Sequence, residues 1–561
     1  MFYQLIQFII ISFFSSLIMI LSGYYFLRHV FVQILSYNKH ITISASYFIG
    51  VTLFLSIYRI LAIVFSNAYI ALMSSLFLAL LISFLLFMDK SFLAKFINNY
   101  LKITNPKNSL LIISLMIGFS FYIFLYWCEP NSNISNPFST IGTLHSIRYS
   151  NISKFIFKNN IVPFLNQNYG QSLLSTIHLF LINKGSLLSL FSWLISSLLF
   201  LIFGIFGIFK YFKYSLINSI LSTSIVMIGT SSISLVPTLI IDSGFPYIFN
   251  GYSDTIISIG TFFIFLYWFL HNVNNNFFKP SFWSLLFLFI LFTGWNIFAP
   301  QNIIVSVFLL FILLFNYKLN SNKFKYLFTI FSSVLLFAYI GSNMGGMLFR
   351  SKLNKHTSTI QGNMTIVAPE KKISIQPTQP YFIYGDSQWE PLDRSLGEDK
   401  PLKKSLNTFI SNPTFLKFVT LFYRILWLIE TNLWIMLKVL GIPIFGLISL
   451  LYLSKNHTRY KYLIPYIKYS LIILFLGILI SYSFSVSSYK WELTRFLIPG
   501  VFLGMISISF FLFNFNFNRK LVYFFSILLI LPHFLLSIRI IYNNFSQLFN
   551  LHNYFKMMMY Y

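Results

Sequence analysis

The sequence predicts an all-α membrane protein, a polytopic transmembrane bundle of about 12 to 14 helices. Its 561 residues are 57% hydrophobic and 20% aromatic, and 9% are charged, whereas ordinary soluble domains carry about 25% charged residues. Apolar runs of about 20 residues, long enough to cross a bilayer as helices, recur from Phe2 to Tyr542. Strands of a membrane barrel alternate apolar and polar residues instead, so these continuous runs indicate helices.

The expected helices are apolar runs bounded by polar or basic turns. The first run lacks a basic n-region and a small-residue cleavage site, so we expect it to be retained as a helix. The N-terminal runs lie near 4–27, 42–65, 68–88, 109–127, 186–209, 216–240, 254–271, 281–298, 302–316 and 326–343. The C-terminal runs lie near 431–453, 463–485, 496–514 and 521–542.

Basic residues predict which helix ends face the cytoplasm, because short cytoplasmic loops are enriched in Lys and Arg. The basic clusters of this chain fall on every second connection. They are Arg28 with Lys39; Lys90, Lys95, Lys102 and Lys107; Lys210 with Lys213; Lys318, Lys323 and Lys325; Lys455, Arg459 and Lys461; and Arg519 with Lys520. We therefore expect a multi-pass protein of the plasma (inner) membrane whose active face is extracytoplasmic.

The opposite side receives two long segments and nearly all of the acidic residues. The chain has only 12 Asp and Glu residues, and all except Asp89 lie in outer segments or at helix ends that face them. The expected organisation is an N-terminal transmembrane bundle, 1–343, which includes an outer amphipathic segment, 128–185. It is followed by an extracytoplasmic loop or small cap, 344–430, and then by C-terminal transmembrane helices, 431–561.

Charge and cysteine content exclude several classes of protein. The net charge of +27 is distributed in short clusters between apolar runs, so we expect no nucleic-acid partner. The single cysteine, Cys128, excludes an intrachain disulfide framework and a cysteine-based metal site. The sequence contains no P-loop, HExxH, GxSxG or Cys/His zinc spacing, which argues against nucleotide-dependent transport by this chain alone.

The first stretch suited to chemistry, 144–172, follows the fourth expected helix. It contains His145, Arg148, Tyr149 and Pro163. Its apolar residues have a spacing that suits a helix lying flat at the membrane interface: Ile147, Ile152, Phe155 and Ile156.

The second stretch, 492–499, reads ELTRFLIP and stands at the outer start of a late helix. The Arg495 guanidinium is suited to a phosphate, because it donates two parallel hydrogen bonds and stays charged near low dielectric. Lys490 adds positive charge. An interfacial belt anchored by Trp491 is the alternative interpretation.

The third stretch, 242–254, lies on a short outer connection. Asp242 begins it, and Gly251-Tyr252-Ser253-Asp254 leads into the next helix. Asp254 is equally explained as a cap of that helix, where the backbone dipole favours a carboxylate.

In these three stretches the chain resembles the GT-C superfamily of membrane glycosyltransferases, which take sugars from polyprenyl-phosphate or related carriers. The first outer loop of that superfamily commonly contains an acidic pair, Arg-Tyr, an amphipathic helix and a later Pro, and Arg148-Tyr149 and Pro163 fit this pattern. The stretch from Arg495 to Pro499 is similar to its Arg-Tyr-Leu-x-Pro pattern. The resemblance covers patches between about residues 130 and 510.

The resemblance implies a transfer of sugar from a lipid carrier to an acceptor hydroxyl. It implies membrane lipids, a lipid-linked sugar donor and a glycan or lipid acceptor as partners. It implies no fixed cofactor, although a divalent metal, Mg²⁺ or Mn²⁺, lies near the base in some members, and the metal ligands of this chain stay unknown. The residues expected to bind substrate are Arg148, Tyr149, Lys490, Glu492 and Arg495, with Arg495 at the carrier phosphate.

The chain departs from the family at the acidic pair, where His145 and Ser146 stand. An acceptor hydroxyl needs a general base, and an imidazole with an ordinary pKa of about 6.5 can serve. The candidate catalytic residues are therefore Glu129, His145, Asp242 and Asp254. A scaffold of this kind without the chemistry is a third interpretation.

Two other functions stay open. A polysaccharide polymerase or O-antigen ligase would use Arg and His in the late outer loop, here Arg350, His356 or Arg394. A transporter or lipid flippase would depend on charge within the membrane, and only Arg59, Glu430 and Lys438 stand in or near apolar runs.

Overall fold

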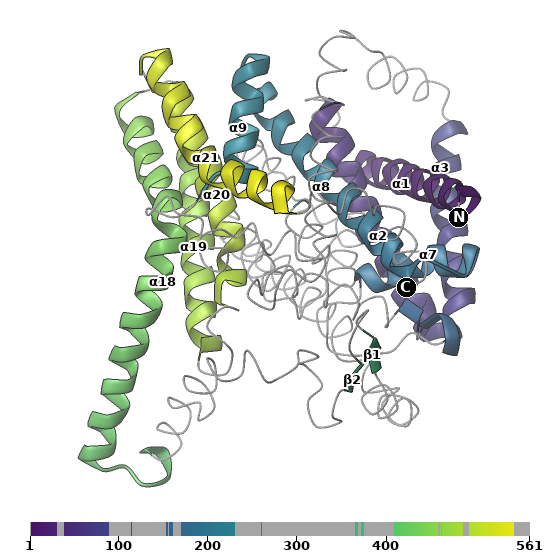
Figure 1. The fold of residues 1–561 in the computed structure, drawn as a ribbon, viewed down its shortest axis with the longest axis horizontal. Coiled ribbons are helices and arrows are strands. Elements are labelled where there is room, and N and C mark those ends of the chain that lie inside the picture. Colours follow the sequence, from purple (N-terminus) through teal and green to yellow (C-terminus); the bar gives the residue numbers. More distant parts are fainter. Residues whose placement is uncertain are drawn as a thin grey trace, which may run out of the picture. The chain divides into compact units, whose positions relative to one another are not determined.

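The computed structural model of the chain is built mainly from helices (Figure 1). It describes residues 2–30, 39–88, 114, 153–154, 156–160, 170–230, 260, 365–367, 372–374, 409–457, 461, 463–485, 493–515 and 517–543. The chain divides into two compact units. The first contains Met1–Thr223, Ile248–Thr359 and Ser537–Tyr561, and the second contains Ser224–Tyr247 and Ile360–Leu536.

Most of the helices in the described residues match the apolar runs of the sequence. The N-terminal helices are α1 (Phe2–Val30), α2 (Lys39–Phe65), α3 (Ala68–Met88), α7 (Gly170–Ile182), α8 (Ser186–Tyr211) and α9 (Leu216–Ile228). The C-terminal helices are α18 (Phe415–Asn456), α19 (Ile464–Ser485), α20 (Leu493–Asn514) and α21 (Arg519–Asn543). The runs predicted at 109–127 and between 254 and 343 lie outside the described residues, apart from positions 114 and 260, which are helical.

Five helices in the described part of the chain are long and apolar enough to cross a membrane. These helices are consistent with the prediction of a helical membrane protein. The predicted total of 12 to 14 spans stays a prediction. The five stretches are Tyr3–His29, Lys39–Ala62, Ala68–Leu86, Leu188–Tyr211 and Leu497–Asn514.

Glycines bring α1 and α2 of the first unit into backbone contact. A Cβ atom added to Gly23 would overlap the carbonyl oxygen of Ser46, and one added to Gly50 would overlap that of Met19. These pairings make the two helices antiparallel. In hydrocarbon, where apolar side chains gain little by leaving lipid, such close approach is what stabilises a helix pair.

Helix α8 packs against α2 in the same antiparallel manner. The hydroxyl of Ser44 donates to the carbonyl oxygen of Phe200 over 2.6 Å, and a Cβ atom on Gly207 would lie 2.8 Å from a side-chain carbon of Ile41. Because α2 contacts α1, α3, α7 and α8, it is the central helix of the first unit.

In the second unit, α20 contacts both α18 and α19. A Cβ atom on Gly504 would overlap Pro443 of α18, and one on Gly446 would lie 2.7 Å from the Gly504 carbonyl oxygen. From α19, Tyr466 donates its hydroxyl to the carbonyl oxygen of Leu503 over 2.7 Å. The core of this unit is therefore a contact between helix backbones.

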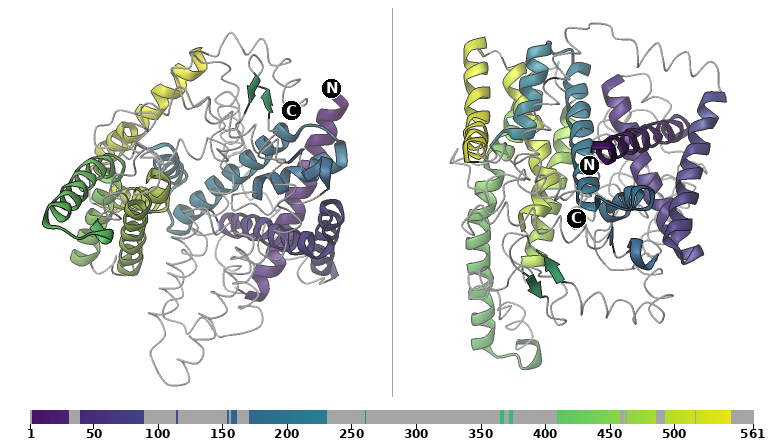
Figure 2. Two further views of the ribbon diagram at one scale, coloured as in Figure 1. Left: turned by 90° about the horizontal axis from the view of Figure 1, so that it is seen from below. Right: turned by 45° about the vertical axis from the view of Figure 1, so that its right-hand side comes forward.

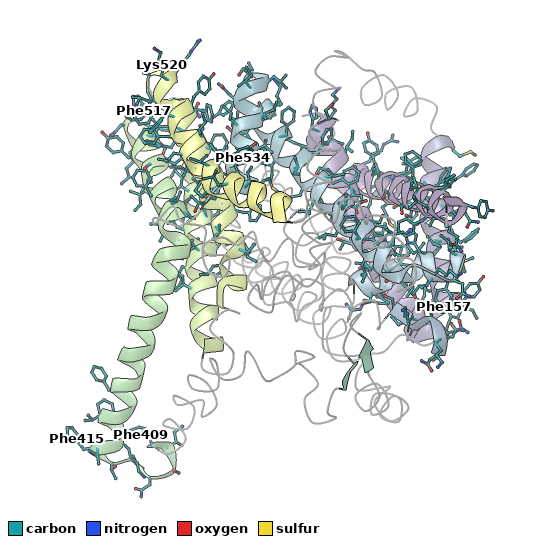
Figure 3. All side chains as sticks on the ribbon, in the orientation of Figure 1. Phe157, Phe409, Phe415, Phe517, Lys520 and Phe534 are labelled. Carbon is teal, nitrogen blue, oxygen red and sulfur yellow. The ribbon has the colours of Figure 1, made fainter. Side chains whose placement is uncertain are left out.

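Within each unit, the described basic turns that were predicted to face the cytoplasm lie at one end. In the first unit, antiparallel packing brings together the end of α1 with Arg28, the start of α2 with Lys39 and the end of α8 with Lys210. In the second, Figure 3 shows Lys520, after the end of α20, opposite the Phe415 end of α18. Each unit by itself thus follows the alternation that the basic residues predict.

Helix α18 is longer than predicted, because it begins at Phe415 rather than near 431. Its 42 residues measure about 63 Å at 1.5 Å per residue, about twice the thickness of the hydrocarbon core. Figures 1 and 2 show its N-terminal part extending past α19 and α20. Lys417, Arg424 and Glu430 interrupt the apolar sequence there, so the apolar run by itself predicts a later start.

The two described strands lie in the long segment 344–430. Strand β1 (Thr365–Val367) pairs antiparallel with β2 (Lys372–Ser374), with Ile366 opposite Ile373. They form a two-stranded sheet, so the described part of this segment includes a small hairpin.

Replacing Gly504 with Val should destabilise the second unit. The added side chain has no space against Pro443, and overpacking of this kind costs about 1–3 kcal/mol. The thermal unfolding midpoint in detergent measures the loss. Ile448→Val, on the exposed side of α18, is the matched control, and an equal effect of both substitutions would contradict this packing.

Candidate functional site

The structure describes one of the nine predicted site residues. Arg495 is the third residue of α20, as the sequence predicted for the start of a late helix. The other predicted catalytic and substrate-binding residues lie outside the described residues: Glu129, His145, Arg148, Tyr149, Asp242, Asp254, Lys490 and Glu492.

Arg495 stands at the entrance of a buried helix. The stretch that can cross a membrane begins two residues later, at Leu497. Leu497 and Ile498 are 1% and 0% exposed, and the helix stays buried through Phe510.

The first turn of α20 can bind an anion. The first four backbone N–H groups of a helix have no partner within it, and the helix dipole adds positive potential there. Phosphate groups bind at such helix starts. A guanidinium in the same turn adds fixed positive charge and paired donors, so the local chemistry of Arg495 suits a phosphate.

A short helical stretch with a buried side and an exposed side lies within the predicted outer segment 128–185. Residues 153–154 and 156–159 are helical. Ser153 and Ile156 are fully buried, whereas Lys158 is exposed. Ser153 donates to the carbonyl oxygen of Ser172 on α7 over 3.1 Å. Burial lowers the pKa of the Lys154 ammonium in this segment.

Asn160 anchors this segment to the start of α3. Its backbone carbonyl accepts from the Ala68 N–H over 2.8 Å, and its side-chain oxygen accepts from the Tyr69 N–H over 2.7 Å. Asn160 has a φ of 54°, a left-handed conformation that Asn tolerates better than most residues. Phe157 packs edge-on against Phe180 of α7 with ring centroids 5.2 Å apart. The segment is therefore held by both α3 and α7.

Asn160→Ala should lower the free energy of unfolding by about 1 kcal/mol, because α3 loses a capping acceptor and Ala fits the left-handed backbone poorly. Denaturant titration in detergent measures this change. Lys158→Ala, an exposed neighbour, should leave stability unaltered. Equal stability of Asn160→Ala and the parent would show that the cap does not hold this segment.

A buried histidine that sequence reasoning missed joins α7 to α1 and α8. His178 is completely buried. Its Nε2 lies 2.9 Å from the Ser12 hydroxyl and its Nδ1 lies 2.7 Å from the Ser189 hydroxyl. Its ring stacks on Phe8 with centroids 4.3 Å apart. The sequence offers one sign of this role, because His178 stands in a short apolar stretch. Its immediate neighbours do not predict that its side chain is buried.

Both ring nitrogens of His178 have a hydroxyl partner, Ser12 at Nε2 and Ser189 at Nδ1. A hydroxyl can donate or accept. The Ser192 hydroxyl extends the cluster by donating to that of Ser12 over 3.0 Å. A neutral imidazole has one donor and one acceptor nitrogen, and both are satisfied. The cluster therefore fastens helices together without carrying charge.

A second hydroxyl contact fixes α7 to the central helix. The Tyr58 hydroxyl of α2 lies 3.1 Å from the Thr176 hydroxyl of α7, and both residues are fully buried. Helix α7, too short to cross a bilayer alone at 13 residues, is thus bonded to three longer helices. It forms a rigid support for the amphipathic segment 153–160.

His178→Leu should lower the free energy of unfolding by about 2 kcal/mol or more, since the buried Ser189 hydroxyl and the half-buried Ser12 hydroxyl each lose a hydrogen-bond partner. A double-mutant cycle with Ser189→Ala, measured by denaturant titration, should give a coupling energy of about 1 kcal/mol. His457→Leu, at an exposed position, is the matched control. Additive effects in the cycle would exclude the His178–Ser189 bond.

Acidic and metal-ligating residues are sparse in the described part of the chain. Glu430, on α18, is the one acid among the residues described, and no three His, Cys, Asp or Glu residues there come close enough to hold a metal ion. No family model, curated protein or solved structure matches this chain. The assignment of a function therefore depends on its residues alone.

Proposed function

We propose that this protein is a membrane glycosyltransferase of the GT-C type, which moves a sugar from a polyprenyl-phosphate-type carrier to an acceptor hydroxyl on the extracytoplasmic face. The carrier phosphate binds Arg495, assisted by Lys490. Arg148, Tyr149 and Glu492 contribute to binding of the substrates.

The position of Arg495 is the observation that carries this proposal. It stands in the first turn of a helix whose next residues, Leu497 and Ile498, are buried. A carrier lipid diffuses in the membrane and presents its phosphate at the level of the headgroups. A guanidinium beside the end of a spanning stretch is at a suitable depth to meet that phosphate.

The chemistry follows from charge. The acceptor oxygen attacks C1 of the sugar, and the bond from C1 to the phosphate oxygen breaks. The acceptor proton passes to a base, for which Glu129, His145, Asp242 and Asp254 are the candidates. Negative charge grows on the leaving phosphate, and Arg495 stabilises it by hydrogen bonds that strengthen as the bond breaks. Orienting both substrates supplies much of the remaining acceleration.

The anchored segment 153–160 supports a substrate-binding role for the first outer loop. An amphipathic helical segment that is fastened at both α3 and α7 keeps a fixed position without crossing the membrane. The basic turns at Lys39 and Lys210 in the first unit and at Lys520 in the second lie at the end away from the start of α3 or of α20, which supports an extracytoplasmic location.

Arg495→Ala should reduce sugar transfer from a lipid-linked donor by about 100-fold or more. The negative charge that develops on the leaving phosphate in the transition state would lose a strong hydrogen-bond donor. Arg495→Lys should recover only part of the activity, since an ammonium lacks the paired geometry. Product formation in proteoliposomes measures both. Arg519→Ala, the same residue type in the first turn of α21, is the matched control.

Three results would contradict the proposal. Unchanged transfer by Arg495→Ala would remove its basis. Loss of activity on substitution of Arg350 or Arg394, with Arg495 dispensable, would favour a polysaccharide polymerase or O-antigen ligase. Substrate flux into vesicles without a covalent product would identify a transporter or lipid flippase.

A further inference from the structure

The basic end of the first unit brings lysines from two helices together. Helix α2 begins at Lys39, and its second residue, His40, packs between Phe203 and Phe206 of α8 with ring centroids 4.7 and 5.3 Å away. A Cβ atom on Gly207 would lie 2.9 Å from that of His40. The two helix ends thus touch, one turn before Lys210 on α8.

Lys210 is held in place by the turn that follows α8. Its Nζ donates to the Tyr214 carbonyl oxygen over 3.0 Å, and the Lys213 N–H donates to the Lys210 carbonyl oxygen over 3.0 Å. An ammonium has three donors, so this bond leaves Lys210 able to donate to a ligand. Lys213, in a left-handed conformation with a φ of 61°, is exposed beside it.

The sequence supplies almost no negative charge to this end. The chain has no Asp or Glu from Met1 to Met88, and none between Glu129 and Asp242. Asp89, which follows α3, is directly followed by Lys90. The dipole of α2 does not neutralise Lys39, because a helix start is its positive end. Several like charges therefore stand close together at the end of an apolar bundle.

We propose that Lys39 and Lys210 form a binding site for the phosphate of an anionic phospholipid, with Lys213 at its edge. The stretch of α2 that can cross a membrane starts at Lys39, and that of α8 ends at Tyr211, so both amines lie at the depth of lipid headgroups. Anionic headgroups attract basic residues at membrane surfaces, and basic pockets between helices bind them specifically. This site is independent of Arg495 and of the proposed transfer reaction.

Lipid binding by these lysines differs from their role in setting the orientation of the helices. Basic loops that only direct insertion have no further effect once the protein is in the membrane. A bound lipid instead stabilises the folded protein in proportion to its concentration, by linkage. The two roles are therefore separable in a purified protein that is already folded.

The test uses the full-length protein in a mild neutral detergent, with thermal unfolding as the measurement. Added phosphatidylglycerol should raise the unfolding midpoint in a saturable manner, whereas phosphatidylcholine and inorganic phosphate should not. Lys39→Gln with Lys210→Gln should weaken the apparent affinity for phosphatidylglycerol about five-fold for each lysine removed. Lys184→Gln, an exposed lysine before the opposite end of α8, should leave that affinity unaltered.

The readout also separates binding from misfolding. The double variant should unfold at a similar midpoint without lipid, and native mass spectrometry should show fewer retained phosphatidylglycerol molecules. An undiminished phosphatidylglycerol response in the double variant, or an equal response to phosphatidylcholine, would overturn the proposal. An equal response to inorganic phosphate would show a simple anion site and would overturn the lipid assignment.

Discussion

Close backbone contact between helices is the constraint on which both units depend. Lipid chains are as apolar as leucine, so burial of apolar area gives little reason for spanning helices to associate. Gly50 in one unit and Gly504 in the other permit helices to approach until backbone atoms touch, which maximises dispersion contacts. These contacts also fix register. Once Met19 meets Gly50, the basic end of α1 lies beside the basic start of α2.

The hydrogen bonds between buried polar side chains of the first unit are also explained by the hydrocarbon environment. A buried hydroxyl or imidazole has no water to bond in hydrocarbon, so it needs a partner from the protein. His178 and Tyr58 find theirs across helix boundaries, at Ser189 and Thr176. These bonds tie the short helix α7 to helices that can span the membrane. The amphipathic segment before α7 gains a fixed base, although it has little apolar surface of its own.

Local features of the sequence could be predicted, and features set by tertiary packing could not. The length of an apolar run is a local property, so α1, α3, α8 and α19 begin and end close to the predicted residues. The burial of His178 depends on residues up to 166 positions away, which no periodicity records. Arg495 is an intermediate case. Its place at a helix start was predicted from neighbouring residues, but the burial of α20 from Leu497 onward depends on tertiary contacts, which include those with α18 and α19.

The burial that begins at Leu497 bears on the interpretation of Arg495, two residues before it. On a lipid-facing helix, a charged residue beside Trp491 would need no further explanation, because both side chains would anchor the protein at the interface. Arg495 stands two residues before the buried stretch that begins at Leu497, where the positive end of the helix dipole and a guanidinium together favour an anion. The basic end of the first unit carries lysines instead. Flexible ammonium groups suit the headgroups of bulk lipid, whereas a planar guanidinium suits one phosphate held in one orientation, as transfer from a carrier requires.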